Sequence, residues 1–359
     1  MIRKALDSLS LFYRLCSVLQ NRGATAAALA NHRRAFYEKA WRDAAAQLGC
    51  SITALGSDIF EVQHGQRRVR VCLNFSPLDD SVTLRLAGRK PTVYRLLTAA
   101  GVPVPKHIAI DSLDLSAAKR FLQAAETPIV VKPAYGTGAG AGVTTNIANG
   151  VQLVRAMAWS RVFCPETVVE EQVAGENYRL LYLDGKLIDC IIRRAPVLTG
   201  DGTASIRELV RRENALRVKA GMTVAQATLR ADLDMKNTLA TLGKSLSSVP
   251  GKGEAVRVKN VINSNRADDN EAAMSLVCKS IVDTGRQVVE QLNVRLAGVD
   301  IITPNPGIGL AEARGAVVDV NTTPGFYYHY LKKGGEFPAA VVVLQTALGD
   351  IGEVRAANG

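Results

Sequence analysis

The sequence lacks any apolar run long enough to cross a membrane. A transmembrane helix needs about 18 consecutive apolar residues, and charged residues, 21% of the 359 positions, interrupt every such stretch. The first 20 residues are basic and partly apolar, but Asp7 and Arg14 interrupt them and no clear cleavage site follows. We therefore expect a soluble, cytoplasmic protein that has an amphipathic first helix and no membrane partner.

Cysteine, histidine and aromatic residues are also scarce. The six cysteines form no CxxC pair and have none of the four histidines at metal-finger spacing, which argues against a zinc finger and fits reduced, buried thiols. Aromatic residues make up 5% of the chain, too few to stack many bases of a single strand. The net charge of +11 comes from scattered basic residues. It therefore favours an enzyme that handles phosphates and carboxylates over a nucleic-acid partner.

No internal repeat divides the chain, which is long enough for two or three packed subdomains. Residues 34–48 show helical spacing of apolar positions before Gly49, and strand-like runs follow at 51–55, 59–63 and 68–75. These elements predict an N-terminal αβ unit of about 85 residues. Further along, we expect a strand over 255–263 and an amphipathic helix over 271–292.

Three oxygen-bearing side chains fall on one predicted hairpin. Residues 299–303 and 316–321 are β-branched runs joined by a Pro/Gly-rich segment. Because side chains alternate faces along a strand, Asp319 and Asn321 share a face that Asp300 can join from the partner strand. Two carboxylates and an amide oxygen suit Mg²⁺. Taken alone, the pattern also fits a hairpin with solvated acids.

Two lysines stand where an anion would be stabilised. Lys90 begins a predicted helix, where its charge opposes the helix dipole. Lys132 ends a strand and precedes Gly136, Gly138, Gly140 and Gly142. This is not the Walker pattern, because the lysine comes before the glycines and no helix follows. It predicts either a hairpin tip whose N–H groups approach phosphate oxygens or a merely mobile glycine turn.

A pair of acids, Glu170 and Glu171, ends another predicted strand. Such acids could bond an adenine amino group, although the signal is weak alone. A hairpin turning at Asp184 and Gly185 follows, and Arg193 and Arg194 close its second strand.

With these segments in order, the chain resembles the ATP-grasp carboxylate-amine ligases, and within them the ATP-grasp portion of cyanophycin synthetases. The resemblance covers about residues 40–345. It rests on these segments, which follow the order of the family: RKPTVYRLLTAAGVPVP, VVKPAYGTGAGAGVTTNI, VVEEQVAGENYRLL, RRAPVLTGDGTASIREL, VPGKGEAVRVKNVIN, AGVDIITP and VDVNTTPGFYYH.

The resemblance implies an α+β ATP-grasp fold with the nucleotide between two subdomains. The expected parts are an N-terminal αβ cap at 1–85, a central subdomain with a glycine-rich lid loop at 86–168, a C-terminal antiparallel-sheet subdomain with the metal site at 169–346, and a tail at 347–359. Because no Mur-ligase-like domain follows Gly359 and no large acyl-transfer domain precedes the fold, we expect a product other than cyanophycin.

By the same resemblance, Lys90, Lys132 and the glycine loop would hold the phosphates of ATP. The adenine would face Glu170, Glu171 and Val173, the ribose would contact Glu176 or Asn177, and two Mg²⁺ ions, with Mn²⁺ as a substitute, would be held by Asp300, Asp319 and Asn321. The chain departs from the family pattern at Asp319, where glutamate is usual, and at Asn177, where an acid is expected.

The resemblance also suggests residues for the chemical step. Arg194, and with it Lys259 or Arg257, would stabilise the substrate carboxylate or its acyl phosphate, because cations match such oxygens. His329 would help to accept the proton of the amine or would only line the pocket.

The expected function is an ATP-dependent ligase that forms an amide bond from small-molecule carboxylate and amine substrates through an acyl phosphate. Three alternatives stay open: a ligase that modifies or macrocyclises a peptide, a non-catalytic nucleotide-binding regulator and a basic nucleic-acid module. If the chain self-associates, a homodimer is expected.

Overall fold

The computed structural model describes residues 7–13, 24–138, 140–220, 227–262 and 265–349. Within these ranges no helix has the length and apolar character needed to cross a membrane. Residues 7–13 are helical, in agreement with the predicted first helix. The rest of that segment, and Asn263 at the end of the predicted strand 255–263, lie outside the described residues.

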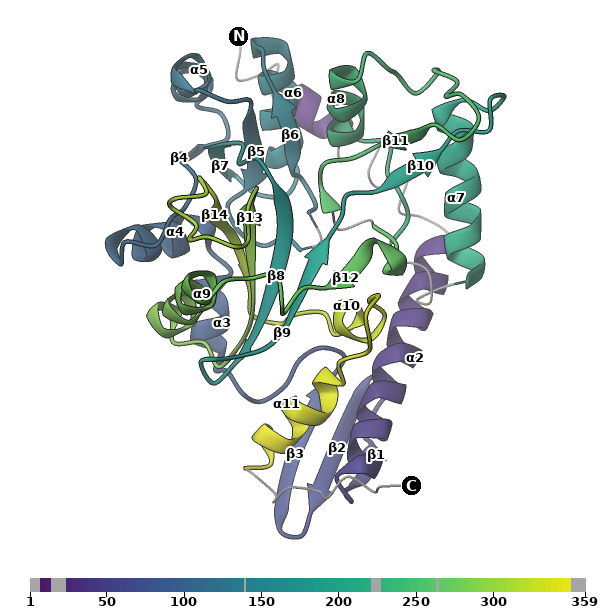
Figure 1. Cartoon of the computed structure of the whole chain (residues 1–359), viewed down its shortest axis with the longest axis vertical. Helices are drawn as coiled ribbons and strands as arrows, with labels where there is room; N and C mark the ends of the chain where they lie inside the picture. Colours follow the sequence, from purple (N-terminus) through teal and green to yellow (C-terminus); the bar gives the residue numbers. More distant parts are fainter. Residues whose placement is uncertain (1–6, 14–23, 139, 221–226, 263–264, 350–359) are drawn as a thin grey trace.

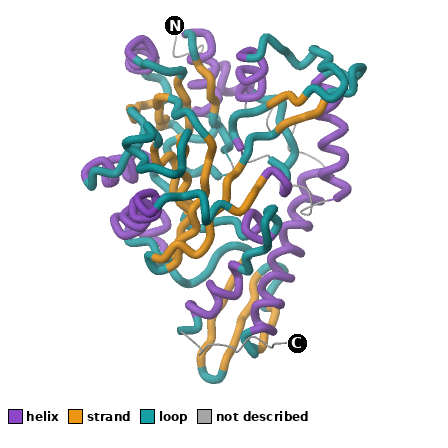
Figure 2. The backbone as a smooth tube through the Cα atoms, in the orientation of Figure 1, coloured by secondary structure: helices purple, strands orange, loops and turns teal. Residues whose placement is uncertain are grey.

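An N-terminal unit forms one end of the molecule (Figures 1 and 2). Strands β1 (Ser51–Ala54), β2 (Ile59–His64) and β3 (Arg67–Cys72) pair antiparallel in that order, as predicted. Helices α2 (Ala24–Gln47) and α11 (Ala339–Ala347) cover this sheet and share one buried apolar cluster with it. A helix near the C-terminus therefore completes the core of the N-terminal unit.

A four-stranded antiparallel sheet, in the order β4-β7-β5-β6, carries the glycine loop. Its strands are β4 (His107–Asp111), β5 (Ile129–Pro133), β6 (Thr144–Ile147) and β7 (Glu166–Glu171). Helices α5 (Leu115–Ala124) and α6 (Gly150–Arg161) pack on the face that Ile129 and Val131 supply. Strand alternation turns Lys132 to the opposite face. Because β7 continues through the boundary expected at 168/169, we propose that the central subdomain ends after Glu171 instead.

A five-stranded antiparallel sheet, in the order β12-β9-β8-β13-β14, forms the centre of the molecule. Its strands are β8 (Glu176–Leu183), β9 (Lys186–Arg193), β12 (Asn270–Ala272), β13 (Leu296–Thr303) and β14 (Ala316–Asn321). Helices α3 (Ser81–Ala87), α4 (Lys90–Ala99) and α9 (Lys279–Leu292) contribute to the apolar core on one face. The other face carries α10 (Tyr327–Tyr330).

The predicted metal hairpin is present in this central sheet as β13 and β14, and its register places Asp300 opposite Asp319. The helix predicted over 271–292 is wrong in its first part, because residues 270–272 form the edge strand β12, which pairs with β9, and the helix begins at Lys279. Edge pairing, a long-range interaction, overrides the local helical spacing there.

A small inserted unit lies between β9 and β12. It contains β10 (Val197–Thr199), α7 (Ile206–Ala220), α8 (Leu233–Thr241) and β11 (Ala255–Arg257) around an apolar cluster of its own. The strand predicted over 255–263 is present only as β11, which ends at Arg257. The hydroxyl of Thr145 on β6 donates to Asp234 on α8 at 2.6 Å, and Asn237 donates to the carbonyl of Thr145 at 3.0 Å. The inserted unit, which is continuous with the central sheet, thus contacts the strand β6 that follows the glycine loop (Figure 1).

Candidate functional site

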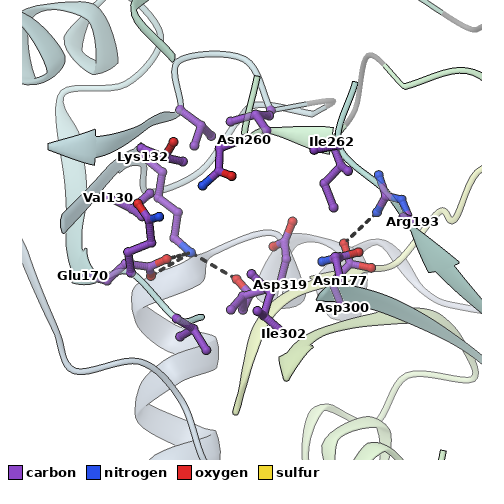
Figure 3. A pocket seen from close by; sticks show the side chains of 18 of the residues that line it. Val130, Lys132, Glu170, Asn177, Arg193, Asn260, Ile262, Asp300, Ile302 and Asp319 are labelled. Atoms are coloured by element: carbon purple, nitrogen blue, oxygen red, sulfur yellow. Dashed lines mark hydrogen bonds and ion pairs between the residues drawn. The ribbon is translucent and has the colours of Figure 1, made fainter. Parts of the chain in front are cut away.

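One open pocket lies between the glycine-loop sheet, the central sheet and the inserted unit (Figure 3). It holds about 1260 Å³ of empty space, its mouth included. The predicted site residues that line it are Lys90, Lys132, Gly138, Gly140, Glu170, Val173, Glu176, Asn177, Arg257, Asp300, Asp319 and Asn321. The fold therefore gathers most of the predicted residues in one place. Those outside its walls are Gly136, Gly142, Glu171, Arg194, Lys259 and His329.

Lys132 on β5 is buried in a complete polar network. Its ammonium donates to Glu170 on β7 at 2.7 Å, to the hydroxyl of Tyr94 on α4 at 2.7 Å and to the carbonyl of Val318 at 3.1 Å. Burial lowers the pKa of Lys132, and the Glu170 carboxylate opposes this shift without cancelling it. Burial and the nearby Glu170 carboxylate raise the pKa of Tyr94 well above its ordinary value, so this hydroxyl stays protonated. Tyr94 was not predicted as a site residue, and it fixes the position of Lys132.

Lys90 at the start of α4 faces the metal hairpin. Its ammonium lies 3.0 Å from the carboxylate of Asp319, and both side chains remain partly exposed. Burial opposes the charge of Lys90, but the attraction of Asp319 outweighs it, and the pKa of Lys90 lies above its ordinary value. Lys90 is therefore a charged group at the pocket wall, with a carboxylate as its partner.

Asp300 on β13 is held by two buried arginines. Arg179 on β8 donates to both of its oxygens at 2.7 Å, and Arg193 on β9 donates to Oδ2 at 3.2 Å. Both guanidinium groups lie over the ring of Tyr328. Burial would raise the pKa of Asp300, but the two arginines hold it below its ordinary value. Two cations thus share one carboxylate that lines the pocket, and Figure 3 shows Arg193 beside Asp300.

The hairpin offers a donor set that fits a hard divalent cation. Asp300, Asp319 and Asn321 carry their side-chain oxygens on one face of the hairpin, and Asn321 Nδ2 lies 3.3 Å from Asp300 Oδ2. Both oxygens of Asp300 accept from arginines in this structure, so a cation there would have to share this carboxylate with them. Because the amide nitrogen of Asn321 donates to Asp300 and to the carbonyl of Gly298, the lone pairs of its amide oxygen are left for a cation. In the described part of the chain no group of three His, Cys, Asp or Glu side chains could hold a metal. Carboxylate and amide oxygens, such as those of the hairpin, suit Mg²⁺ or Mn²⁺ better than a zinc-type ion.

Three residues with predicted roles, Arg194, Lys259 and Glu171, do not line the pocket. Arg194 is half exposed and pairs with Glu271 at 3.4 Å outside the pocket. Lys259 is buried, and its ammonium lies 2.6 Å from both oxygens of Asp232. This ion pair anchors the inserted unit next to the pocket wall and leaves no free charge for a substrate. Glu171 accepts from the backbone of Glu126 and lies 3.7 Å from Lys106, so its carboxylate is also engaged elsewhere.

His329 on α10 is fully buried behind the pocket rather than in its wall. Its Nδ1 lies 2.7 Å from Asp189, which also binds Lys332, and its Nε2 has no hydrogen-bond partner among the described residues. Burial lowers the pKa of His329 although Asp189 opposes this shift. The imidazole therefore stays neutral, and a role as acceptor of the amine proton is not supported.

We expect the stability of the protein to fall as the pH drops below about 6.5, the ordinary pKa of histidine. The unfolded chain takes up a proton that folded His329 resists, beside the cations Lys332 and Arg179, so acid favours unfolding. The measurement is the urea midpoint between pH 7.5 and 5. His329→Asn, which keeps a donor for Asp189, should lose less stability over this range than the wild type. An equal loss in both proteins would contradict the assignment.

Sequence reasoning missed Arg179 and Arg193, whose positive charges line the pocket. Arg193 pairs in register with Asn177, and Arg179 lies two residues beyond Asn177 on the same strand. All three therefore share one face of the sheet. Counted from the predicted turn at Asp184 and Gly185 alone, Ile192 would pair with Asn177 and Arg194 would share its face. A register shift between Leu181 and Tyr182 brings Arg193 to that face instead.

Known proteins resemble the chain both in sequence and in structure. It is 26% identical over 340 residues to the cyanophycin synthetase of Trichormus variabilis, a match that covers 90% of this chain and 37% of that enzyme. It is 24% identical over 261 residues to the bifunctional glutathione biosynthesis protein of Streptococcus mutans. This match covers 71% of this chain and 34% of that protein. The chain thus spans little more than a third of these relatives. No protein-family model matches it.

A solved structure supports the predicted fold. The bifunctional glutathione synthetase from Pasteurella multocida superposes with a TM-score of 0.52 at 18% sequence identity, covering 86% of this chain and 43% of that one. The predicted resemblance in sequence and the predicted α+β fold class are both confirmed.

Proposed function

We propose that this chain, which has the α+β ATP-grasp fold, is an ATP-dependent ligase that joins a carboxylic acid to an amine through an acyl phosphate. One observation carries the proposal: two lysines, an oxygen-rich hairpin and two buried arginines line the same pocket. The similarity to a cyanophycin synthetase and to a glutathione biosynthesis protein supports it. The proposed substrates are small amino-acid-like or peptide-like molecules.

In the proposed complex the nucleotide lies between the two sheets. Lys90 and the amides near Gly138 and Gly140 face its phosphates, and Lys132, whose three protons are engaged, adds positive charge beside them. For the ribose we prefer Asn177 to Glu176, because Asn177 Oδ1 is buried at the pocket wall without a hydrogen-bond partner among the described residues. A buried acceptor without a partner costs free energy that a ligand hydroxyl would recover.

Asp300, Asp319 and Asn321 would hold the divalent cations, which we propose to be two Mg²⁺ ions with Mn²⁺ as a substitute. Bound there, they would supply positive charge to the transferring phosphoryl group. The chain itself supplies orientation, since β13 and β14 fix all three donors on one hairpin.

In the first step an oxygen of the substrate carboxylate attacks the γ-phosphorus. The new O–P bond gives an acyl phosphate, and the bond to ADP breaks. The amine then attacks the acyl carbon, the bond from that carbon to the phosphate oxygen breaks, and the departing phosphate takes up the proton that the amine loses as the amide forms. We propose that Arg193, beside Arg179, stabilises the acid and its acyl phosphate, because burial and Arg179 lower the pKa of Arg193 and an anion would relieve this repulsion.

We expect Arg193→Met to lower kcat/KM for the acid about 100-fold, which is the effect of losing a charge-assisted bidentate contact. Asp300 keeps Arg179 as its partner in this variant, so the dissociation constant of a non-hydrolysable ATP analogue should stay within about twofold of the wild type. Arg194→Met is the matched control and should leave both quantities nearly unchanged. Larger damage from Arg194→Met than from Arg193→Met would reverse the assignment.

The function is tested by screening pairs of amino acids and short peptides for release of ADP and phosphate, followed by mass measurement of the product. A product equal in mass to acid plus amine minus water supports the ligase. ADP formation that requires a peptide acceptor would select the peptide-modifying ligase. Nucleotide binding without turnover on any pair would select the non-catalytic regulator.

A further inference from the structure

The ion pair between Lys90 and Asp319 differs from the other ion pairs of the pocket. Its two side chains are 16% and 34% exposed. In contrast, Lys132 and Glu170 are 6% and 5% exposed, and Arg179 and Asp300 are 5% and 9% exposed. Of these three ion pairs, Lys90–Asp319 is the most exposed and therefore separates at the lowest desolvation cost.

The hydrogen bonds of the two lysines support the same conclusion. An ammonium has three protons, and Lys132 gives its three to Glu170, Tyr94 and the carbonyl of Val318. Lys90 makes an ion pair with Asp319, and Glu170 and Asp300 attract it without forming an ion pair with it among the described residues. A phosphate oxygen can thus reach Lys90 by displacing Asp319, without breaking a complete buried network.

We propose that the Lys90–Asp319 ion pair couples the binding of nucleotide to the binding of the divalent cation. This inference rests on the proposed function, since it assigns Lys90 to a phosphate and Asp319 to the metal. A phosphate drawn to Lys90 releases Asp319, and a cation drawn to Asp319 releases Lys90. Each ligand removes the partner that competes for the group the other ligand needs. By linkage the two effects are equal.

The coupling makes a prediction that separates it from simple metal ligation. If Asp319 only binds metal, its loss removes one negative charge and tightens metal-free nucleotide binding equally whether residue 90 is lysine or, in Lys90→Gln, glutamine. If Asp319 also occupies Lys90, its loss frees the ammonium, and the gain is larger when Lys90 is present than in the Lys90→Gln background. The expected change is about tenfold, within the usual range of coupling between sites.

The first experiment measures the dissociation constant of a non-hydrolysable ATP analogue by calorimetry in EDTA and in Mg²⁺. We expect Asp319→Asn to bind about tenfold more tightly than the wild type in EDTA and to gain little from Mg²⁺. In the Lys90→Gln background the same substitution should give a smaller gain in EDTA. The matched control is Asp184→Asn, which makes the same change in charge at an exposed ion pair with Arg295, outside the pocket. Its backbone φ of 47° is one that asparagine tolerates.

The reciprocal experiment measures Mn²⁺ binding without nucleotide by electron paramagnetic resonance. Lys90→Gln should bind Mn²⁺ more tightly than the wild type, because Asp319 then lacks its ammonium partner. Lys279→Gln, which removes an exposed pair with Asp283, is the control. Both gains support the coupling.

If the wild type binds the analogue with Mg²⁺ but either variant shows no gain, or Asp319→Asn gains as much in the Lys90→Gln background, the coupling is refuted and the proposed function stands. A wild type that binds no analogue under any condition would overturn both.

Discussion

Replacing Asn321 with alanine is expected to lower ATP-dependent phosphate release about a thousandfold, because one of three hairpin oxygens is lost where phosphoryl charge develops. Asn321 donates to Asp300 at 3.3 Å and to the carbonyl of Gly298 at 3.4 Å, so its loss should cost only about 1 kcal/mol of stability. The measurement is phosphate release at saturating substrates with Mg²⁺ varied from zero to several millimolar.

The control for this prediction is Asn305→Ala, an exposed asparagine in the loop of the same hairpin that does not line the pocket. It should retain nearly full activity and the same dependence on Mg²⁺. Normal turnover by Asn321→Ala, with a melting temperature close to that of the wild type, would remove the metal assignment.

Replacing Gly175 with alanine is expected to destabilise the protein by about 3 kcal/mol or more. Gly175 lies just before β8 at a φ of 121°, and a Cβ there would stand 2.2 Å from the carbonyl carbon of Thr303 and 2.4 Å from the nitrogen of Pro304. Two backbone segments must move apart to admit a methyl group. Because Gly175 also lines the pocket, nucleotide affinity should fall as well. Thermal unfolding and calorimetry measure the two effects.

Gly185→Ala separates the clash from backbone strain. Gly185, at the β8–β9 turn, also has a positive φ, of 74°, but a Cβ there would meet no atom within 4 Å. This variant should therefore lose only about 1 kcal/mol. Equal losses in the two variants would show that the close approach at Thr303 does not decide the stability.

Local patterns in the sequence predicted a large part of the candidate site. Alternation along two β-branched runs placed Asp300, Asp319 and Asn321 on one hairpin, and a strand ending in Lys132 before spaced glycines gave the loop beside it. Such features depend on neighbours within a few residues, and their spacing in the sequence reports them directly. The helix predicted over 271–292 failed in its first part because pairing with β9, far away in the sequence, decides residues 270–272.

The sequence by itself determined the residue types, the two strand–loop units and the resemblance that connects them. Only the tertiary structure decided which charged groups face the pocket: Arg193 rather than Arg194, with Lys259 and His329 buried against Asp232 and Asp189. The physical reason is that the ion-pair partner of a charged side chain decides whether that side chain is free to contact a ligand. Those partners come from other strands and helices, and their distances are set by the packing of whole sheets.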